Sequence, residues 1–532
     1  MLVGLSGRFY AGVSSLAEVE LLSLLALLCL TVSGAWAQTY DNTVSINDGD
    51  VEVPDGEHWL ITGTGETTEN TICLYYNATV TLSGVNISTS STCISCVGKN
   101  TIILADGTTN TLTSTGDNNA AIAIESQGET LTITGSTGVL NAKSGRYAAG
   151  IKGLSDCEIN ICGGIITATG GTNGACIGAS YNNKCGNILI SGGTITAMNG
   201  NGAACIGASQ SSACGNITIS GGTVTATATG RWSAGIGCGS NGGCGNILIS
   251  GGTVAATGAS YGAGIGCGRY SKCGTITIIE GVKRVTATKG SNGSYFGKTT
   301  EGTCSTVTID GVEDATETST FTHFSSEVST DNSTWTLTHN RYDVTANLVD
   351  GAYWSTFYSE IGNHEAPEGT QVFAVNLTGS VITMTEIEDG IVKSGEGVVL
   401  KQATESSNLT TTIIMTLTED ASNGDFSTNS LQGTATSITT TGNAYVLNNG
   451  TQGVGFYKLS SGGTIGANKA YLTYSGDLAR EFFLFEVASG IGAALNDNVE
   501  MINDNVYDLQ GRRVSQPAKG LYIVNGKKYI KK

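Results

Sequence analysis

The chain has 532 residues, among them 76 glycines and only 3 prolines, and its formal charge is −18. This acidic balance disfavours a nucleic-acid partner, because phosphates would be repelled. The glycines follow no three-residue period, which excludes a collagen-like triple helix. No proline lies between Pro54 and Pro367, and such a glycine-rich stretch of Thr, Ser, Ile and Val suits short strands joined by tight turns.

The N-terminus has the pattern of a signal peptide. Residues 21–32 (LLSLLALLCLTV) form an apolar run too short to span a bilayer comfortably. Small residues at Ala35 and Ala37 then offer a cleavage site, which predicts a signal peptide over residues 1–37 and a secreted or cell-surface protein. Glu18 and Glu20 stand where such peptides usually carry positive charge, so an uncleaved N-terminal anchor is the alternative.

An internal repeat of about 29 residues organises the first half of the chain. Three residue patterns keep this phase. They are the isoleucines Ile151, Ile177, Ile206, Ile236 and Ile265, the cysteines Cys157, Cys185, Cys214, Cys244, Cys273 and Cys304, and the Gly-Gly pairs that begin at Gly163, Gly192, Gly221 and Gly251.

Each repeat contains three short extended pieces, which in one unit are residues 175–179, 187–191 and 194–197. Apolar and small polar residues alternate in each piece, as in strands. Three such strands cannot bury their inner faces alone, whereas coils stacked about 4.8 Å apart pair every backbone group with the next coil. The sequence therefore predicts an all-β protein with a right-handed parallel β-helix of three strands per coil over residues 38–312.

The corners of the coils carry asparagines and cysteines. Asn187, Asn216 and Asn246 align as a ladder whose side chains can hydrogen-bond along the stack. Export would permit disulfides, while the alternatives are a ladder of buried free thiols and a zinc site. The candidate pairs within a coil are Cys176/Cys185, Cys205/Cys214, Cys238/Cys244 and Cys267/Cys273.

Acidic residues are missing from the most regular coils. No Asp or Glu lies between Glu158 and Glu280, so these coils offer no carboxylate for acid–base catalysis, nucleophilic attack or calcium binding. We therefore expect a protein that is not an enzyme and has no cofactor, with calcium possible only outside residues 159–279. A β-helix polysaccharide lyase or hydrolase is the runner-up, using the scattered acids of the outer coils, and a structural surface stalk is the third reading. Those acids are Asp106, Asp117, Glu125, Asp156 and Glu158.

Aromatic and basic residues gather near the phased isoleucines. Aromatic faces pack on sugar rings, and basic groups attract acidic polysaccharide, so we expect a polysaccharide or a host or cell-surface glycan as the partner. The alternative is that turn aromatics only cover the ends of the coils. The candidate binding residues are Tyr147, Tyr181, Arg231, Trp232, Tyr261, Arg269, Tyr270 and Lys272.

The repeats resemble a known family. The phrases GACIGAS (174–180), GAGIGCG (262–268), CGNILISGGTITA (185–197) and CGNITISGGTVTA (214–226) are similar to the carbohydrate-binding β-helix repeats of gut and cellulolytic bacteria. The resemblance covers roughly residues 90–312 and implies a calcium-assisted, non-catalytic binding or adhesin-like β-helix. The missing acids of residues 159–279 depart from any calcium-dependent member.

The sequence pattern changes after residue 312, where the repeat ends. Alternating segments at 342–348, 371–375, 397–401, 410–417 and 481–487, separated by turn residues, predict an antiparallel β-sandwich over residues 313–488. The pieces WSTFYSE (354–360), GVVLK (397–401), GVGFYKL (453–459) and ANKAYL (467–472) resemble a module common in Bacteroidetes surface proteins.

The last 44 residues (489–532) are expected to form a linker and a tail. Residues 506–532 (VYDLQGRRVSQPAKGLYIVNGKKYIKK) resemble the C-terminal sorting domain of the type nine secretion system. That resemblance implies recognition by an outer-membrane secretion machinery and attachment at the cell surface. The simpler alternative is a terminal strand pair of the preceding sandwich.

Overall fold

A computed structural model describes residues 39–199, 202–379, 381–435, 437–450, 453–474, 481–485, 506–508, 510–514, 520–524 and 527–531. The chain divides into two compact units, Met1–His339 and Asn340–Lys532, and each is described by itself. The expected signal peptide lies outside the described residues, as does most of the expected linker. Within the described ranges, no helix has the length and apolar character needed to cross a bilayer.

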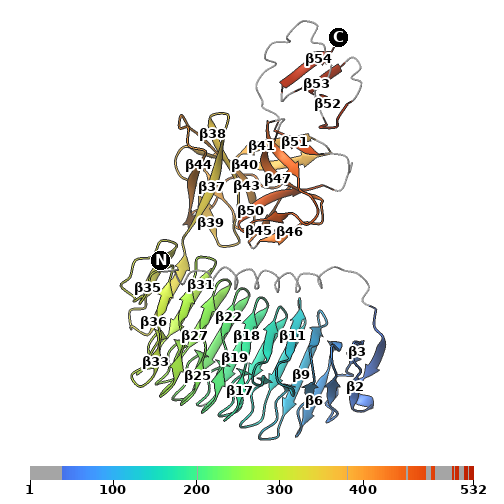
Figure 1. The fold of residues 1–532 in the computed structure, drawn as a ribbon, viewed down its shortest axis with the longest axis vertical. Helices are drawn as coiled ribbons and strands as arrows, with labels where there is room; N and C mark the ends of the chain where they lie inside the picture. The colour runs from blue at the N-terminus through green and yellow to red at the C-terminus, as the bar shows by residue number, and fades with distance from the viewer. Residues whose placement is uncertain are drawn as a thin grey trace, which may run out of the picture. The chain divides into compact units, whose positions relative to one another are not determined.

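The first unit is a parallel β-helix, as predicted (Figure 1). Its first sheet consists of the parallel strands β1 (Asn42–Ser45), β3 (His58–Thr62), β5 (Thr79–Ser83), β8 (Asn100–Leu104), β11 (Thr130–Gly135), β14 (Glu158–Ile161), β18 (Asn187–Ile190), β22 (Ile217–Ile219), β26 (Ile247–Ile249), β30 (Ile276–Ile278) and β34 (Val307–Ile309). A short 3₁₀ helix, η1 (Ile46–Asp48), follows β1.

The second sheet runs along another side of the coils. Its parallel strands are β2 (Val51–Val53), β4 (Ile72–Leu74), β7 (Ile94–Cys96), β10 (Ile122–Ile124), β13 (Ile151–Lys152), β16 (Ile177–Gly178), β20 (Ile206–Gly207), β24 (Ile236–Gly237), β28 (Ile265–Gly266) and β32 (Phe296–Gly297).

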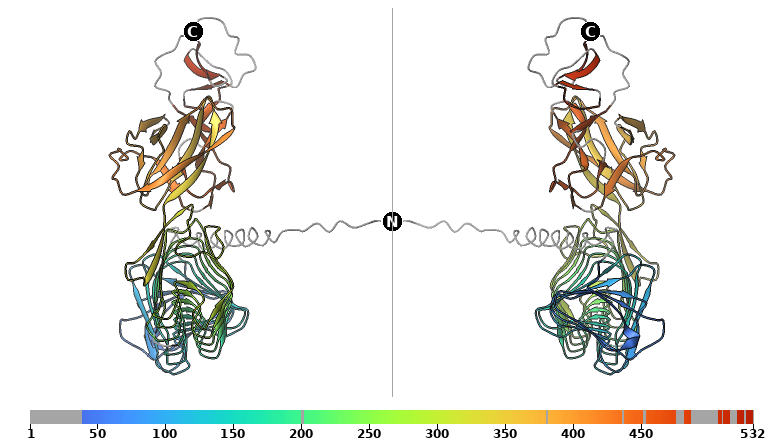
Figure 2. Two further views of the ribbon diagram at one scale, coloured as in Figure 1. Left: turned by 90° about the vertical axis from the view of Figure 1, so that its left-hand side faces the viewer. Right: turned by 90° about the vertical axis from the view of Figure 1, so that its right-hand side faces the viewer.

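The third sheet completes the coils. Its parallel strands are β6 (Asn86–Thr89), β9 (Thr109–Ser114), β12 (Val139–Lys143), β15 (Ile165–Thr169), β19 (Thr194–Asn199), β23 (Thr223–Ala228), β27 (Thr253–Thr257) and β31 (Arg284–Thr288). Figure 2 shows the coils almost end-on, lying over one another around a shared interior.

The phased isoleucines form one file through the second sheet. Ile151 pairs with Ile177, and the register continues through Ile206, Ile236 and Ile265. All five side chains are fully buried. The glycine that follows four of them has a φ of +133°, +127°, +126° or +134°, a backbone conformation that glycine adopts without strain. This repeated Ile-Gly step explains why the later strands of the second sheet have only two residues.

A fourth, short sheet at one corner was not predicted. It consists of β17 (Lys184–Cys185), β21 (Ala213–Cys214), β25 (Gly243–Cys244), β29 (Lys272–Cys273) and β33 (Thr303–Cys304), and its cysteines stack in register. Cys157 does not belong to this file, because Glu158 pairs with Asn187 and so places Cys157 opposite Gly186. The cysteines of the file carry free thiols in the structure.

A hairpin closes the C-terminal end of the β-helix. Strand β36 (Thr334–His339) pairs antiparallel with β31 and with β35 (Phe324–Val328), which covers an edge that would otherwise invite pairing with another chain. Trp335 is buried there against Phe296 and Tyr295. Residues 313–339, which the sequence analysis placed in the second domain, therefore lie with the β-helix.

The second unit is antiparallel, as expected. An eight-stranded sheet has the order β41 (Val381–Glu386), β40 (Thr370–Thr378), β43 (Gly397–Ala403), β38 (Ala352–Tyr358), β37 (Arg341–Val349), β44 (Thr410–Thr418), β39 (Asn363–Glu365), β42 (Ile391–Val392). A five-stranded sheet has the order β45 (Leu431–Thr434), β50 (Lys469–Thr473), β47 (Ala444–Gly450), β48 (Gly453–Lys458), β51 (Phe482–Leu484), and a two-stranded one joins β46 (Ile438–Thr439) to β49 (Thr464–Ile465).

The two larger sheets of this unit share a core. Phe373 and Val399 of the eight-stranded sheet cluster with Tyr445 and Phe456 of the five-stranded sheet. Near the C-terminus, β52 (Val506–Asp508), β53 (Gly520–Val524) and β54 (Lys527–Lys531) form a separate three-stranded antiparallel sheet. The expected tail therefore has short strands of its own.

Candidate functional site

The turns on either side of the second sheet meet on one surface of the β-helix. The backbone N–H of Arg269, in the turn after β28, donates to the carbonyl of Trp232, in the turn before β24, at 2.8 Å. The N–H of Tyr181 donates to the carbonyl of Tyr147 in the same way, at 2.9 Å. Because the strand between the two turns is so short, residues on both of its sides reach the same surface.

Five of the predicted binding residues come together there, and we call Arg231, Trp232, Tyr261, Arg269 and Tyr270 the arginine–aromatic surface. The Arg231 guanidinium carbon lies 5.5 Å from the centre of the Trp232 ring. The guanidinium carbon of Arg269 lies 5.1 Å from the Tyr261 ring and 4.6 Å from the Tyr270 ring. These are cation–π distances, so Arg269 covers part of two aromatic faces that sugar rings would otherwise contact.

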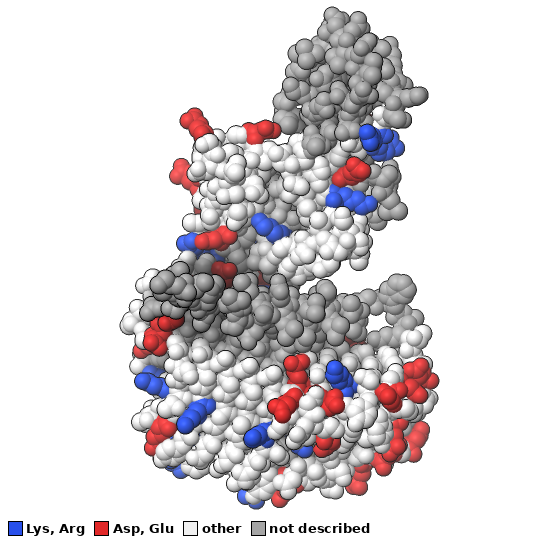
Figure 3. Space-filling model, in the orientation of Figure 1, with Lys and Arg blue, Asp and Glu red and all other residues white. Residues whose placement is uncertain are grey.

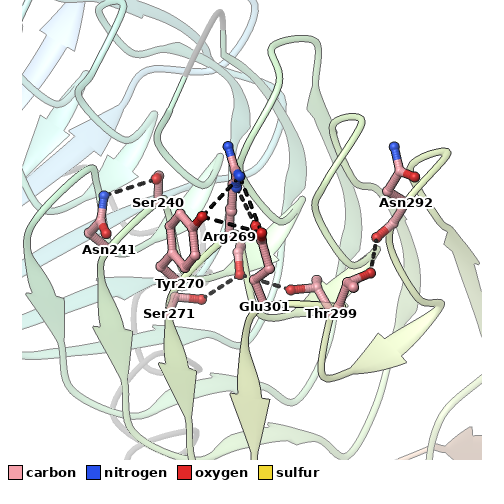
Figure 4. Close-up of polar contacts among 10 residues, drawn as sticks. Ser240, Asn241, Arg269, Tyr270, Ser271, Asn292, Thr299 and Glu301 are labelled. Atoms are coloured by element: carbon pink, nitrogen blue, oxygen red, sulfur yellow. Dashed lines mark hydrogen bonds and ion pairs between the residues drawn. The ribbon is translucent and has the colours of Figure 1, made fainter.

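Glu301 completes this surface, and the sequence analysis missed it. Its carboxylate forms an ion pair with Arg269 and accepts a hydrogen bond from the hydroxyl of Tyr270 at 3.2 Å (Figure 4). The hydroxyl of Tyr270 in turn accepts one from Nη2 of Arg269 at 2.9 Å. The Glu301 hydrogen bond raises the pKa of Arg269, and the pKa of Glu301 is lowered by the same contact. Glu301 lies 32 residues after Arg269, one more than the 31 residues between the paired Gly266 and Gly297, so the repeat alone does not bring the two together.

Tyr270 is held in an unusual backbone conformation. Its φ is +55°, in the left-handed region, and its side chain is 53% exposed. The same turn of the three preceding coils has Asn182, Ser211 and Asn241 with φ values of +54°, +53° and +52°. Asparagine tolerates this region far better than an aromatic residue. A strained residue that is also exposed points to a role other than packing.

Trp232 contributes an unused donor. Its Nε1 atom is buried and has no hydrogen-bond partner among the described residues, whereas buried polar atoms in proteins almost always have one. The side chain as a whole is half-buried. A water molecule or a ligand hydroxyl would satisfy this donor.

The remaining predicted binding residues lie elsewhere. Tyr147 and Tyr181 form a separate pair, with ring centres 5.6 Å apart. Arg146, which the sequence analysis also missed, lies 5.1 Å from the Tyr147 ring centre. Lys272 belongs to β29 of the fourth sheet, with an exposed side chain. The eight candidates therefore divide into the arginine–aromatic surface, the tyrosine pair and an isolated lysine.

Some of the acids of the outer coils have structural partners. Asp156 occupies a turn with a φ of +61°. Glu158 accepts a hydrogen bond from Asn160 at 2.8 Å, and Glu125 lies 3.6 Å from Lys152. In the part of the chain that the structure describes, no three His, Cys, Asp or Glu residues are arranged to hold a metal ion. Figure 3 shows acidic side chains gathered at the end of the β-helix that holds β2 and β3.

Comparison with known proteins supports the repeat. A family model described as a beta helix repeat matches residues 188–210, 217–240 and 247–269, and each match spans one strand from each of the three main sheets. No curated protein and no solved structure matches the chain. The stacked register and the repeat matches together show that the first unit contains a parallel β-helix with beta helix repeats.

Proposed function

We propose that this protein is a non-catalytic surface or secreted protein that binds polysaccharide, or a glycan of a host or neighbouring cell, through the arginine–aromatic surface. The observation that carries the proposal is Tyr270, which is exposed and strained at a turn where neighbouring coils use asparagine or serine. Side chains that combine aromatic area with fixed polar groups are suited to sugar recognition.

The chemistry of the surface favours an acidic or hydroxyl-rich ligand. Arg231 and Arg269 supply two cations, and the Trp232 and Tyr261 rings flank them. A guanidinium can bind a uronic acid carboxylate with two parallel hydrogen bonds. Glu301 already neutralises Arg269, so a polyuronate would compete with that carboxylate, whereas a neutral glycan would use the rings and the hydroxyl of Tyr270.

A screen of soluble neutral and acidic polysaccharides against the full chain tests this proposal. We expect binding that falls at least about tenfold in Trp232→Ala and in Tyr261→Ala, which corresponds to the loss of one aromatic contact each. Tyr76→Ala is the matched control, because this tyrosine is 50% exposed in a distant N-terminal coil. Unchanged affinity in both surface variants, or no binding to any glycan, would refute the proposal, and the latter result would favour a structural stalk.

Export is part of the same proposal. The predicted signal peptide over residues 1–37 and the sorting-like tail over residues 506–532 support it. The tail has three short strands, in keeping with a compact terminal module. Deleting residues 506–532 should leave the protein inside the native producing cell, whereas the full chain should be cleaved by protease added to intact cells. Equal surface exposure of both forms would contradict a sorting role.

One observation favours polysaccharide lyase activity as a second candidate. The hydroxyl of Tyr270 lies between Arg269 and Glu301, at 2.9 Å and 3.2 Å from their nearest atoms, and a positioned phenol beside a cation can serve in proton transfer. Incubation with polygalacturonate, followed by the ultraviolet absorbance of unsaturated ends, tests this activity. Activity that disappears in Tyr270→Phe would establish the lyase, and the absence of product would leave the binding function.

A further inference from the structure

Two successive coils place a pair of cysteines at the fourth-sheet corner with their sulfurs in contact. Sγ of Cys238 lies 2.8 Å from Sγ of Cys244. One coil further, Sγ of Cys267 lies 3.1 Å from Sγ of Cys273. In both pairs the first cysteine directly follows a strand of the second sheet and the second ends a strand of the fourth sheet.

The preceding coils provide an internal comparison. Gly178, Gly207, Gly237 and Gly266 are in register, so the residues that follow them are equivalent. Two coils have alanine at this position, Ala179 and Ala208, opposite the thiols of Cys185 and Cys214. A second thiol therefore joins the corner only in the coils of Cys238 and Cys267.

We propose that Cys238 and Cys244, and likewise Cys267 and Cys273, form disulfides within their coils when the protein folds in an oxidising compartment. The oxidant is another disulfide, either of a small thiol such as glutathione or of a protein oxidase. The Cys244 thiolate attacks one sulfur of that disulfide and releases a thiolate, which leaves a mixed disulfide. The Cys238 sulfur loses its proton, attacks the Cys244 sulfur and releases the second thiolate. The protein loses two hydrogens, and the oxidant is reduced to two thiols.

Electrostatics in the Cys238/Cys244 pair support this order of attack, whereas in the second pair the neighbouring thiols lower the pKa of Cys267 instead. Hydrogen bonds from the thiols of Cys238 and Cys273 lower the pKa of Cys244, and a lowered pKa favours the nucleophilic thiolate. Burial raises the pKa of Cys238. Cys244 is half-buried, whereas Cys238 is fully buried, so Cys244 is the more exposed residue of the pair.

Bonding within a coil is favoured over bonding between coils. A disulfide has an S–S bond of about 2.05 Å and Cβ atoms about 3.8 Å apart. Stacked strands about 4.8 Å apart also fall within the Cα range of a disulfide, so the preference rests on the sulfurs, which are in direct contact within each coil. Within a coil, the sulfurs start at 2.8 Å and 3.1 Å and need to approach by about 0.8 Å and about 1.1 Å, and the turn that joins them can adjust.

The second disulfide would also enclose part of the arginine–aromatic surface. Arg269 and Tyr270 lie between Cys267 and Cys273, and Asn241, between Cys238 and Cys244, donates its N–H to the carbonyl of Arg269 at 2.9 Å. Closing both turns would hold these side chains in place before a ligand arrives, which reduces the entropy lost on binding. This consequence rests on the proposed function, but disulfide formation itself does not.

Peptide mapping of the full chain tests the proposal. The protein is folded in a buffer of reduced and oxidised glutathione, its remaining thiols are alkylated under denaturing conditions, and it is digested with chymotrypsin without reduction. Cleavage after Trp232, Tyr261, Tyr270 and Tyr295 yields peptides 233–261, 262–270 and 271–295. We expect peptide 233–261 to lack two hydrogens and to carry no alkyl group, and peptide 262–270 to be joined to peptide 271–295. Cys185 and Cys214 should be fully alkylated.

A variant separates the two bonds. Cys238→Ala copies the alanine of the preceding coils, so it should leave Cys244 alkylated while peptides 262–270 and 271–295 stay joined. A link between peptides 233–261 and 262–270, a link to Cys304, or complete alkylation of all four cysteines after oxidative folding would overturn the proposal. Loss of glycan binding with both disulfides intact would instead count against the proposed function alone.

Discussion

The side-chain Oδ1 atom of Asn216 accepts a hydrogen bond from the backbone N–H of Asn246, one coil further along, at 2.9 Å. Asn187 makes the same contact with the N–H of Asn216, and Asn246 makes it with the N–H of Thr275, each at 2.9 Å. The asparagine ladder therefore works through the backbone of the next coil rather than through amide-to-amide stacking. Each asparagine satisfies a donor at a corner where sheet pairing is interrupted.

Asn216→Ala should weaken the connection between successive coils at this corner. We expect the free energy of unfolding of the β-helix to fall by about 1 kcal/mol, the usual value of one net hydrogen bond. Urea denaturation of the full chain measures the loss, and hydrogen exchange should show faster exchange of the Asn246 amide. Thr218→Ala is the control, because Thr218 lies two residues further along, in β22, where neighbouring coils pair through their backbones. Equal effects of the two variants would show that the ladder adds nothing to stability.

Gly245→Ala should be more damaging than loss of the asparagine. A Cβ at Gly245 would overlap Oδ1 of Asn216, so the alanine displaces the hydrogen-bonding side chain. Overpacking of this kind typically destabilises by 1–3 kcal/mol, or about 2 kcal/mol here. In the double variant Asn216→Ala/Gly245→Ala, the overlapping atom is gone, so the combined loss should be smaller than the sum of the single losses. Additive losses would contradict the overlap.

The repeat made the β-helix predictable. A period near 29 residues places equivalent side chains on top of one another, and the file from Ile151 to Ile265 follows directly from it. Cys157 is an exception to this rule. Its spacing of 28 residues from Cys185 fits the repeat, but the strand register places it one position away from the cysteine file. Residue spacing alone therefore does not determine which residues stack. Insertions in the corners change the spacing without changing the sheet register.

The candidate site was less predictable than the fold. Phase alone placed Trp232 and Tyr261 on adjacent coils, but it did not show that Arg269 would cover the Tyr261 and Tyr270 rings. Glu301 lies outside the acid-free residues 159–279 and is one position out of phase with Arg269, so the repeat did not predict this contact. Which long side chains meet depends on rotamers, and the sequence period does not determine them.

Tyr270→Asn separates a folding role from a binding role. Asparagine relieves the strain of a left-handed residue, while the exposed contacts with Arg269 and Glu301 are worth little to stability. We therefore expect the free energy of unfolding to change by less than about 0.5 kcal/mol, while affinity for the polysaccharide found in the screen falls. A large loss of stability in urea would show instead that the tyrosine is kept for folding.

Glu301→Gln should change the preference between acidic and neutral glycans. The carboxylate of Glu301 neutralises Arg269, and its removal leaves the guanidinium free to bind a ligand carboxylate. Affinity for a polyuronate should rise by up to about fivefold, because an exposed ion pair is screened by solvent and contributes only weakly. Affinity for neutral glycans should be unchanged. Affinity electrophoresis at low and high salt measures both, and equal changes for the two ligand classes would contradict the expectation.

A buried histidine should make the second unit sensitive to acid. His364 is fully buried on β39, with its ring centre 5.2 Å from that of Tyr342 and 5.5 Å from that of Phe357. Neither ring nitrogen has a hydrogen-bond partner among the residues that the structure describes. Burial lowers the pKa of His364 from 6.5 to about 4, so the folded protein keeps this ring neutral.

The unfolded chain binds a proton at His364 near pH 6.5, whereas the folded chain resists it until about pH 4. Stability should therefore fall as the pH drops through this window, by roughly 3 kcal/mol at its lower end. In His364→Phe this contribution is absent, so the difference in unfolding free energy between the two proteins should shift with pH in favour of the variant. Other titrating groups are common to both proteins and cancel in that difference. Urea denaturation at several pH values, following the unfolding transition of the second unit, measures this difference in unfolding free energy. A difference that stays constant from about pH 7 to about pH 4 would show that the histidine is not protonated on unfolding.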